Sequence, residues 1–539
     1  MTSATGDTPR PDRPDVRFPE VVSLPPEVLA RHRARMLEPP TALRAPDGAW
    51  PMSTAYRADS LLLPAGEARD LIPDQPNEYN EVLGPIGVEL RPSGDERWQE
   101  NLRNAHPDLP VPVQLVTRAD AVTDRAPDPW TALVRARRAL GERGARLGLN
   151  HLVGAASVAI EGAPVNHGGS VDGAPVNHGG GLADGRIALY TGSRNPVAML
   201  LKRPTRRPAA ELVGGRRPVV AVLDTGIGTH NWLPVGPVTA DPVVEVSDDF
   251  QLALAAHEPW LTPHPLAGVA DQPDVIQPLL GLTDSHFGHG TFVTGLIHQM
   301  CPDARVLSLR VLESDGFSTE GSVLFALDWL RRRIEAAIAN NTPDQLVDVV
   351  SMSLGFYPET ATPTDAAQIA AAVERLTDLG VVVIAAAGND ATTRPFLPAA
   401  FGADASGAHG NPMLAAIGAL NASGFTTAAF SNDGPWVWRW APGNALVSTV
   451  PMWEGAANPG VGKLDSGGVG PRMRTSPDPD DLRTGFAVWA GTSFATPVVA
   501  GMLADSLCRD PETKVAFGQS RARNALKLTD LRLTERGWR

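Results

Sequence analysis

The chain has 539 residues, of which 43% are hydrophobic and 20% are charged, so it is long enough for two or three domains with a large core. A formal net charge of −13 argues against nucleic acid as the main partner. No stretch approaches the roughly 20 apolar residues that a membrane-spanning helix needs, and two cysteines, Cys301 and Cys508, argue against a disulfide scaffold without excluding one bridge.

The first 50 residues are rich in proline, arginine and aspartate, and we expect an extended arm with one short helix near residues 27–36. Its first 20 residues contain no apolar core, so a secretory signal is not expected. The protein is therefore predicted to be cytoplasmic.

Residues 51–195 have a globular composition and are predicted to form a small α+β domain. Apolar residues alternate over residues 86–90 and 111–115, which indicates two strands with one buried face each. Asp128 and Pro129 then make an N-cap and first-turn pair before an apolar stripe at helical spacing. The polar face of that helix carries five arginines, which we interpret as a solvated face; the alternative is a surface that docks on a following, acidic domain.

A short duplication follows, because the sequence GAPVNHGG occurs at residues 162–169 and again at 173–180. The copies contain His167 and His178, but no Cys, Asp or Glu stands at ligand spacing in both of them. We therefore expect a flexible loop and no metal site. Residues 196–217, rich in proline and arginine, are expected to be a linker.

From residue 218 to residue 510, strongly hydrophobic strands alternate with helices, which indicates a parallel sheet covered on both faces. The predicted strands are 219–223, 305–312, 346–352, 381–387 and 414–418, and the predicted helices are 291–300, 320–340 and 366–379. We therefore predict a doubly wound α/β fold, with its ligand site at the carboxyl ends of the strands. Residues 511–539 are expected to form an exposed tail with a helix and a strand.

Four polar side chains stand just after predicted strands or at the start of helices. Asp224 ends the first strand, where a carboxylate can accept a hydrogen bond from a histidine ring and fix its tautomer. His289 lies between glycines before an apolar helix, so its ring can reach both a carboxylate and a hydroxyl. Asn389 follows a predicted strand, where an amide N–H can bind an oxygen that gains negative charge. Ser493 opens a buried helix, a position that suits a nucleophile in acyl transfer.

The segments around these residues resemble the motifs of the subtilisin-like (subtilase, S8 family) serine proteases. The string GTSFATP around Ser493 is similar to the nucleophile motif of that family, with Phe494 and Thr496 where the family usually has Met and Ser. The HGT that begins at His289 and the AAGN that ends at Asn389 are similar to the histidine and oxyanion motifs.

This resemblance covers about residues 218–507 and implies a serine endopeptidase that acts on peptide or protein substrates. It implies a triad of Asp224, His289 and Ser493, with Asn389 and the Ser493 N–H holding the oxyanion. It also implies two substrate-binding segments, which are Ser353, Leu354 and Gly355, and Ala386, Ala387 and Gly388. No cofactor is required for this chemistry.

Two insertions, residues 230–285 and 451–483, are expected to border the substrate groove. The second contains Asp478, Asp480 and Asp481. Subtilases often bind calcium, and a structural calcium ion stays open for this reason. Because the three aspartates show no regular ligand spacing, we favour a solvated acidic loop and assign no metal site.

The N-terminal domain has three alternative roles. It is a prodomain docked on the catalytic domain, with Lys202 to Arg217 as the processing region, or a permanent adaptor that selects substrates, or a latency device that a partner releases. The sequence alone leaves these alternatives open.

Three other functions compete with a general endopeptidase. One is a maturation peptidase dedicated to a co-expressed peptide, and a less favoured one is a catalytically silent, peptide-binding pseudoprotease. The third is an aspartic protease, because Asp224-Thr225-Gly226 and Asp465-Ser466-Gly467 form two similar triplets. We disfavour it because no strand is predicted before the second triplet.

Overall fold

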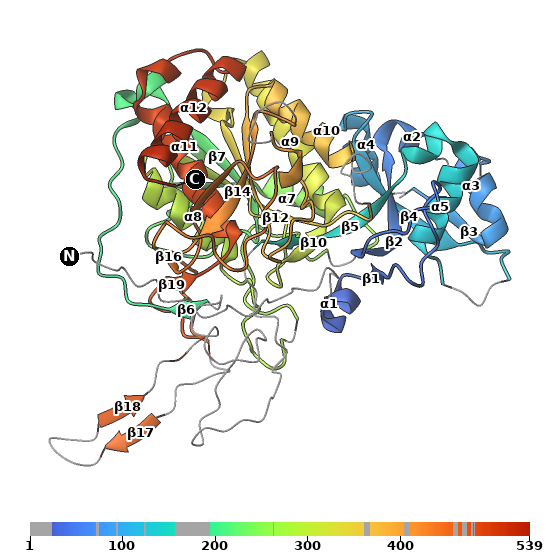
Figure 1. The fold of residues 1–539 in the computed structure, drawn as a ribbon, viewed down its shortest axis with the longest axis horizontal. Coiled ribbons are helices and arrows are strands. Elements are labelled where there is room, and N and C mark those ends of the chain that lie inside the picture. Colours follow the sequence, from blue (N-terminus) through green and yellow to red (C-terminus); the bar gives the residue numbers. More distant parts are fainter. Residues whose placement is uncertain are drawn as a thin grey trace, which may run out of the picture.

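The computed structural model shows an N-terminal α+β unit packed against a larger α/β unit (Figure 1). It describes residues 24–71, 75–92, 95–122, 126–156, 194–261, 264–276, 278–360, 367–403, 410–455, 462–465, 472–475, 478 and 480–538. The duplicated segment at 162–180 lies outside these residues. Among the helices in the described ranges, none is both long enough and apolar enough to cross a membrane.

Seven parallel strands form the central sheet of the larger unit, in the order β15, β14, β13, β11, β7, β9 and β8. Their bounds are Val219–Asp224 (β7), Val244–Val246 (β8), Arg305–Arg310 (β9), Val349–Met352 (β11), Val382–Ala386 (β13), Leu414–Leu420 (β14) and Arg439–Pro442 (β15). The predicted parallel α/β sheet is confirmed. The sequence predicts the longer strands to within a few residues but misses β8 and β15, which are too short to show a hydrophobic period.

Helices cover both faces of this sheet (Figure 1). Alternate residues of β7 point to opposite sides, so Val219 and Leu223 belong to one core and Val220 and Val222 to the other. The helices on the first side are α7 (Asp248–Ala255), α9 (Glu320–Ala339) and α10 (Ala367–Asp378). Those on the second side are α8 (His289–Met300), α11 (Thr492–Arg509) and α12 (Gln519–Glu535).

The N-terminal unit is built on an antiparallel sheet in the order β5, β2, β4 and β3, with β1 paired to β2. The strand bounds are Ala34–Leu37 (β1), Thr54–Pro64 (β2), Val88–Arg91 (β3), Pro110–Thr117 (β4) and Gly148–Ala155 (β5). Its helices are α1 (Pro26–Arg31), α2 (Ala65–Arg69), α3 (Glu78–Leu83), α4 (Glu96–Asn104), α5 (Pro129–Leu140) and α6 (Glu142–Ala145). Thus the short helix expected in the extended arm is present as α1, and the arm also contains a paired strand, β1, that was not expected.

The helix expected from Asp128 and Pro129 is α5, and the Asp128 carboxylate accepts a hydrogen bond from the Thr131 amide at 3.0 Å, as an N-cap does. Its arginine face mostly contacts the N-terminal unit itself. Arg137 is the exception within the described part of that face, because its guanidinium lies 3.8 Å from Glu359 of the larger unit.

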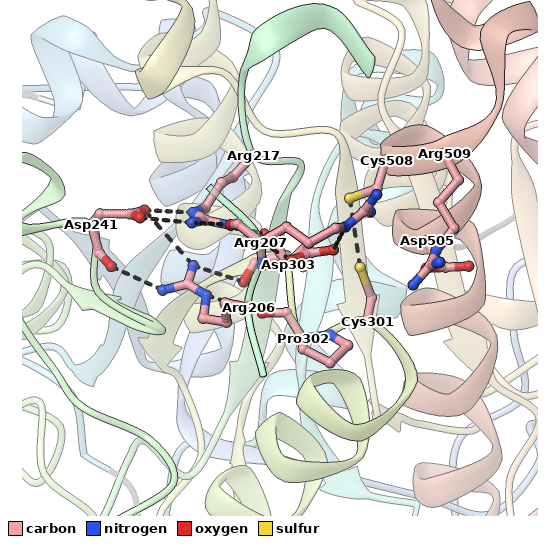
Figure 2. Close-up of polar contacts among 11 residues, drawn as sticks. Arg206, Arg207, Arg217, Asp241, Cys301, Pro302, Asp303, Asp505, Cys508 and Arg509 are labelled. Carbon is pink, nitrogen blue, oxygen red and sulfur yellow. Dashed lines mark hydrogen bonds and ion pairs between the residues drawn. The ribbon is translucent and has the colours of Figure 1, made fainter. Parts of the chain in front are cut away.

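Residues 194–217, called the strap below, run along the larger unit (Figures 1 and 2). β6 (Asn195–Pro196) pairs with β19 (Phe486–Trp489), which also pairs with β16 (Leu446–Thr449). The polar contacts of the strap include Arg206 with the Pro302 carbonyl (3.0 Å), Arg207 with Asp303 (2.7 Å) and Arg217 with Asp241 (2.5 Å). The region predicted as a linker is therefore fixed to the larger unit by buried and half-buried arginines.

The last residues of the chain form α12, which packs on α11 and buries Ala522, Ala525 and Leu533. No strand follows it within the described residues up to 538. The expectation of an exposed tail with a strand is therefore wrong, because the apolar face of α12 completes the second core.

Cys301 and Cys508 lie at the carboxyl ends of α8 and α11, and both are buried (Figure 2). Their sulfur atoms are 3.7 Å apart, so the two free thiols are within hydrogen-bonding distance and are not joined by a disulfide.

Candidate active site

Asp224 and His289 meet at the carboxyl end of β7. Asp224 is the last residue of this strand, and His289 is the first residue of α8, after Gly288 with a φ of 88°. The Oδ1 atom of Asp224 lies 2.7 Å from Nδ1 of His289 and also accepts a hydrogen bond from the Thr225 amide at 2.7 Å. Both side chains are buried, and Nε2 of His289 makes no hydrogen bond within the described residues. The ring therefore has one nitrogen fixed by a carboxylate and one nitrogen available for proton transfer.

Ser493 lies in the first turn of α11, and Phe494 beside it packs on the imidazole. The ring centres of Phe494 and His289 are 5.2 Å apart, and the Trp489 ring contacts both of them. The Ser493 hydroxyl donates to the Ser353 carbonyl at 3.0 Å, and the Ser353 hydroxyl donates to the Ser493 carbonyl at 2.8 Å. The structure thus brings Ser493 next to Ser353, with its hydroxyl bonded to a backbone carbonyl.

Asn389 follows β13 and is oriented by the residue before Ser493. Its Oδ1 atom accepts hydrogen bonds from the amide and the hydroxyl of Thr492, both at 2.9 Å. Its Nδ2 group is buried and has no hydrogen-bond partner among the described residues. Gly388 before it has a φ of 101°, which a residue with a side chain rarely adopts. An unpaired amide donor therefore faces the site beside the start of α11.

The chain's own strand β5 lies beside Ser493, between two short strands of the larger unit; its place between them is called the groove below. It lies between β10 (Phe317–Thr319) and β12 (Leu354–Gly355) and pairs with both in antiparallel fashion. Residues 353–355 are thus the partners of this strand, and Ala386 and Ala387 are buried near them at the end of β13.

Ala156, just after β5, makes the contacts closest to the candidate nucleophile. Its amide donates to the Ser353 carbonyl at 2.9 Å, and its carbonyl oxygen accepts a hydrogen bond from the Ser493 amide at 2.7 Å. The Thr492 hydroxyl is 3.4 Å from the same oxygen. A peptide carbonyl in this place has its oxygen on a helix N-terminus, where developing negative charge is stabilised.

The sequence did not reveal the segment 153–156 as part of the site. Leu152 and Val153 with the small residues after them can be interpreted as the end of a strand, but the pairing partners lie more than 150 positions away. Strand pairing over such a distance leaves no local pattern. The position of Ala156 could therefore only be found in three dimensions.

The described aspartates of the second insertion contact other protein groups. Asp481 pairs with Arg483, whose hydrogen bonds lower the pKa of that carboxyl, and Asp478 accepts a hydrogen bond from the Asp480 amide. No group of three or more His, Cys, Asp or Glu side chains in the described ranges could hold a metal ion.

The second Asp-Ser-Gly triplet does follow a strand, contrary to the sequence expectation, because β17 (Gly462–Asp465) ends at its aspartate. This strand pairs only with β18 (Arg472–Thr475), and Figure 1 shows the hairpin projecting away from the large sheet. Asp465 therefore does not share a site with Asp224, and a paired-carboxylate mechanism has no support.

The sequence matches a family model described as "Subtilase family" over residues 215–530. Among curated proteins it is 27% identical over 288 residues to the minor extracellular protease Epr of Bacillus subtilis (strain 168), covering 51% of this chain and 35% of that protein. It is 29% identical over 236 residues to subtilisin E of the same organism, covering 41% of this chain and 46% of that protein. The matches thus span less than half the length of these two relatives.

Two solved structures are also similar to the chain. One is a cold adapted subtilisin-like serine proteinase, with 19% identity, a TM-score of 0.36 and coverage of 63% of this chain and 87% of that one. The other is the prenylagaramide maturation protease PagA, with 22% identity, a TM-score of 0.33 and coverage of 60% and 83%.

Proposed function

This chain belongs to the subtilase family, and from this premise we propose that it is a serine endopeptidase that hydrolyses peptide bonds through Asp224, His289 and Ser493. The observation that carries the proposal is the 2.7 Å contact between Asp224 and the His289 ring, beside a serine whose backbone N–H already binds a peptide carbonyl. Together these contacts supply an oriented base and an oxyanion site.

In the proposed reaction, the Ser493 side chain rotates from the Ser353 carbonyl toward Nε2 of His289, which takes its proton as the hydroxyl attacks. The oxyanion is held by the Ser493 N–H and by Nδ2 of Asn389, which Thr492 leaves free. His289 then protonates the leaving amine, and water hydrolyses the acyl-enzyme by the reverse sequence of proton transfers. Asp224 keeps the ring oriented and stabilises its protonated form.

We further infer that the N-terminal unit is an internal inhibitor and the first substrate of this site. β5 fills the groove as an extended peptide would, with the Ala156 carbonyl on the Ser493 amide. The bond to be cut is therefore the one between Ala156 and Ser157. This position supports the prodomain alternative over a permanent adaptor. The former candidate region, Lys202 to Arg217, belongs to the strap, and its arginines bind Pro302, Asp303 and Asp241 of the larger unit, whereas Ala156 binds Ser493.

The endopeptidase proposal is tested by labelling purified protein with a fluorophosphonate and measuring hydrolysis of a fluorogenic peptide. We expect one label, on Ser493, and we expect Ser493→Ala to lower kcat by roughly six orders of magnitude. Ser506→Ala is the matched control, because Ser506 is a buried serine of the same helix whose hydroxyl bonds to the Met502 carbonyl. Activity that survives in Ser493→Ala would overturn the assignment. A wild-type chain that takes no label and cuts no peptide even after its N-terminal unit has been cleaved and released would favour the pseudoprotease alternative.

A further inference from the structure

A buried carboxylate of the first insertion lies beside the two loops that carry Asp224 and His289. Asp271 belongs to the residues between β7 and α8 and is buried. Its neighbours contact the loop after β7 and the end of β9, because Ala270 forms a parallel bridge with Ile227 and the Gly268 carbonyl accepts a hydrogen bond from Arg310 at 3.0 Å. This part of the insertion therefore packs against the residues that follow Asp224 and against the end of β9.

The Asp271 carboxylate joins the two loops directly. Its Oδ2 atom accepts a hydrogen bond from the Thr225 hydroxyl at 2.9 Å and another from the Gly288 amide at 2.7 Å. Thr225 follows Asp224 in the chain, and Gly288 precedes His289. The Thr225 hydroxyl also accepts a hydrogen bond from the Gly290 amide at 3.0 Å. One carboxylate oxygen thus ties the residue after Asp224 to the residues on both sides of His289.

We propose that Asp271 is a positioning residue that holds Asp224 against the His289 ring through Thr225 and Gly288. The inference rests on the proposed peptidase function and adds to it a group that belongs to the insertion. Asp271 touches neither the imidazole nor the hydroxyl, so its effect is on the geometry of the two loops. A misplacement of reacting groups by about 1 Å can cost on the order of 100-fold in rate.

The surroundings of Asp271 indicate that its carboxylate positions the two loops and does not stabilise the folded protein. Its second oxygen, Oδ1, is buried without a hydrogen-bond partner within the described residues, which is an unfavourable environment for a carboxylate. Burial raises its pKa, although the hydrogen bonds from Gly288 and Thr225 and the charge of Arg310 oppose this rise, and the resulting pKa is about 7.

Three full-length variants test the proposal through kcat and KM for a fluorogenic peptide, with active sites counted by fluorophosphonate. Asp271→Ala removes both hydrogen bonds, and we expect kcat to fall about 10- to 100-fold with KM nearly unchanged. Asp271→Asn keeps one carbonyl oxygen that can accept both bonds, and it should recover most of kcat. Asp284→Ala is the matched control, because Asp284 is a buried carboxylate of the same insertion that binds the Val275 amide and Ser314 instead of the neighbours of the triad.

The outcomes separate the two proposals. A wild type that stays inactive after its N-terminal unit has been released would defeat the peptidase function itself. An active wild type with Asp271→Ala at the same kcat, or with Asp271→Asn as slow as Asp271→Ala, would overturn the positioning role. If Asp271→Ala does not fold, Thr225→Val tests the proposal instead. It removes the hydroxyl that bonds to both Asp271 and the Gly290 amide and changes the side-chain volume little. A wild-type kcat in Thr225→Val would then contradict the proposal.

Discussion

Thr492 fixes the orientation of the Asn389 side-chain amide before any substrate binds. Thr492 donates twice to Oδ1 of Asn389, so the NH₂ end must face away from Thr492 and into the site. A donor that is held in place before the reaction costs no reorganisation when the negative charge develops. This arrangement makes Asn389 the side chain most directly suited to the oxyanion.

We expect Asn389→Ala to lower kcat by about two to three orders of magnitude with little change in KM, because the lost donor acts mainly in the transition state. Asn421→Ala is a suitable control, since Asn421 directly follows β14 of the same sheet and its side chain hydrogen-bonds to Thr426, Thr427 and Asn444. Steady-state kinetics on a peptide substrate measure the effect. An Asn389→Ala enzyme within a few-fold of the wild type would rule out its role at the oxyanion.

At the scale of single residues, the sequence predicts where the site lies better than how its atoms are bonded. Asp224, His289 and Asn389 were located from strand ends and helix starts, and the structure brings the first two into contact. The bond between the Ser493 hydroxyl and the Ser353 carbonyl was not foreseen. Asp271 was missed for a similar reason, because its partners are backbone and hydroxyl groups that no motif identifies.

Among the elements, β5 has the most consequence because it belongs to two sheets. It pairs with β2 in the N-terminal unit and with β10 and β12 in the larger unit. β10 and β12 have three and two residues and no periodicity of their own, so they become strands through pairing with β5. This is why the sequence predicts the long parallel strands but cannot predict the groove that receives β5.

His151 of β5 lies in the interface between the two units, where its ring contacts two carboxylates of the larger unit. Its Nδ1 lies 2.6 Å from Glu320 and its Nε2 lies 2.9 Å from Glu359, and its ring stacks on Phe356. Arg137 faces Glu359 from the other side at 3.8 Å. Burial acts to lower the pKa of His151, but the two carboxylates outweigh it and raise the pKa to about 9.

Docking of the N-terminal unit should therefore weaken as the solution becomes alkaline. The pKa of His151 is higher in the docked state than its ordinary value of 6.5, so its contribution is complete below about pH 6.5 and is lost as the pH rises through about 9. After cleavage at Ala156, we expect roughly tenfold more fragment released at about pH 10 than at about pH 6, measured by gel filtration.

Two variants control this measurement. His151→Gln should weaken the dependence on pH, because one of the two histidines that titrate against carboxylates of the larger unit is gone; the other, His32, has its Nε2 2.7 Å from Asp315 and a raised pKa. His106→Gln should change it little between about pH 6 and pH 10, since burial and the charges of Arg375 and Arg331 lower the pKa of His106, so its ring is mostly neutral over this range. Release that is independent of pH in the wild type would contradict the role of His151.

Across the whole molecule, the described residues on either side of 157–193 are fixed to the larger unit by different means. Ala156 lies in the groove, whereas the strap begins at residue 194 with Arg194, which donates to the Thr283 hydroxyl at 2.8 Å, and with the pairing of β6. A cut after Ala156 would leave the strap attached to the larger unit, and only non-covalent contacts would then hold the N-terminal unit.

The sequence largely predicts the overall architecture, but it does not predict which segment lies at the candidate active site and which is fixed elsewhere on the larger unit. Hydrophobic strands and helices identified the α/β unit, and alternation identified β3 and β4 of the smaller unit. The proline and arginine content of Lys202 to Arg217 is typical of exposed linkers and therefore favours this segment as the processing region. Sequence composition cannot show that these arginines have acidic partners, such as Asp241 and Asp303, elsewhere in the chain.

The most direct test of this account is the intact mass of freshly purified wild-type chain and of Ser493→Ala, followed over time. We expect the wild type to divide into two fragments that meet at the bond between Ala156 and Ser157, while Ser493→Ala stays whole. A wild-type chain that remains intact under conditions in which it cleaves added peptides, or a Ser493→Ala chain that is cut at the same bond and rate, would contradict the account.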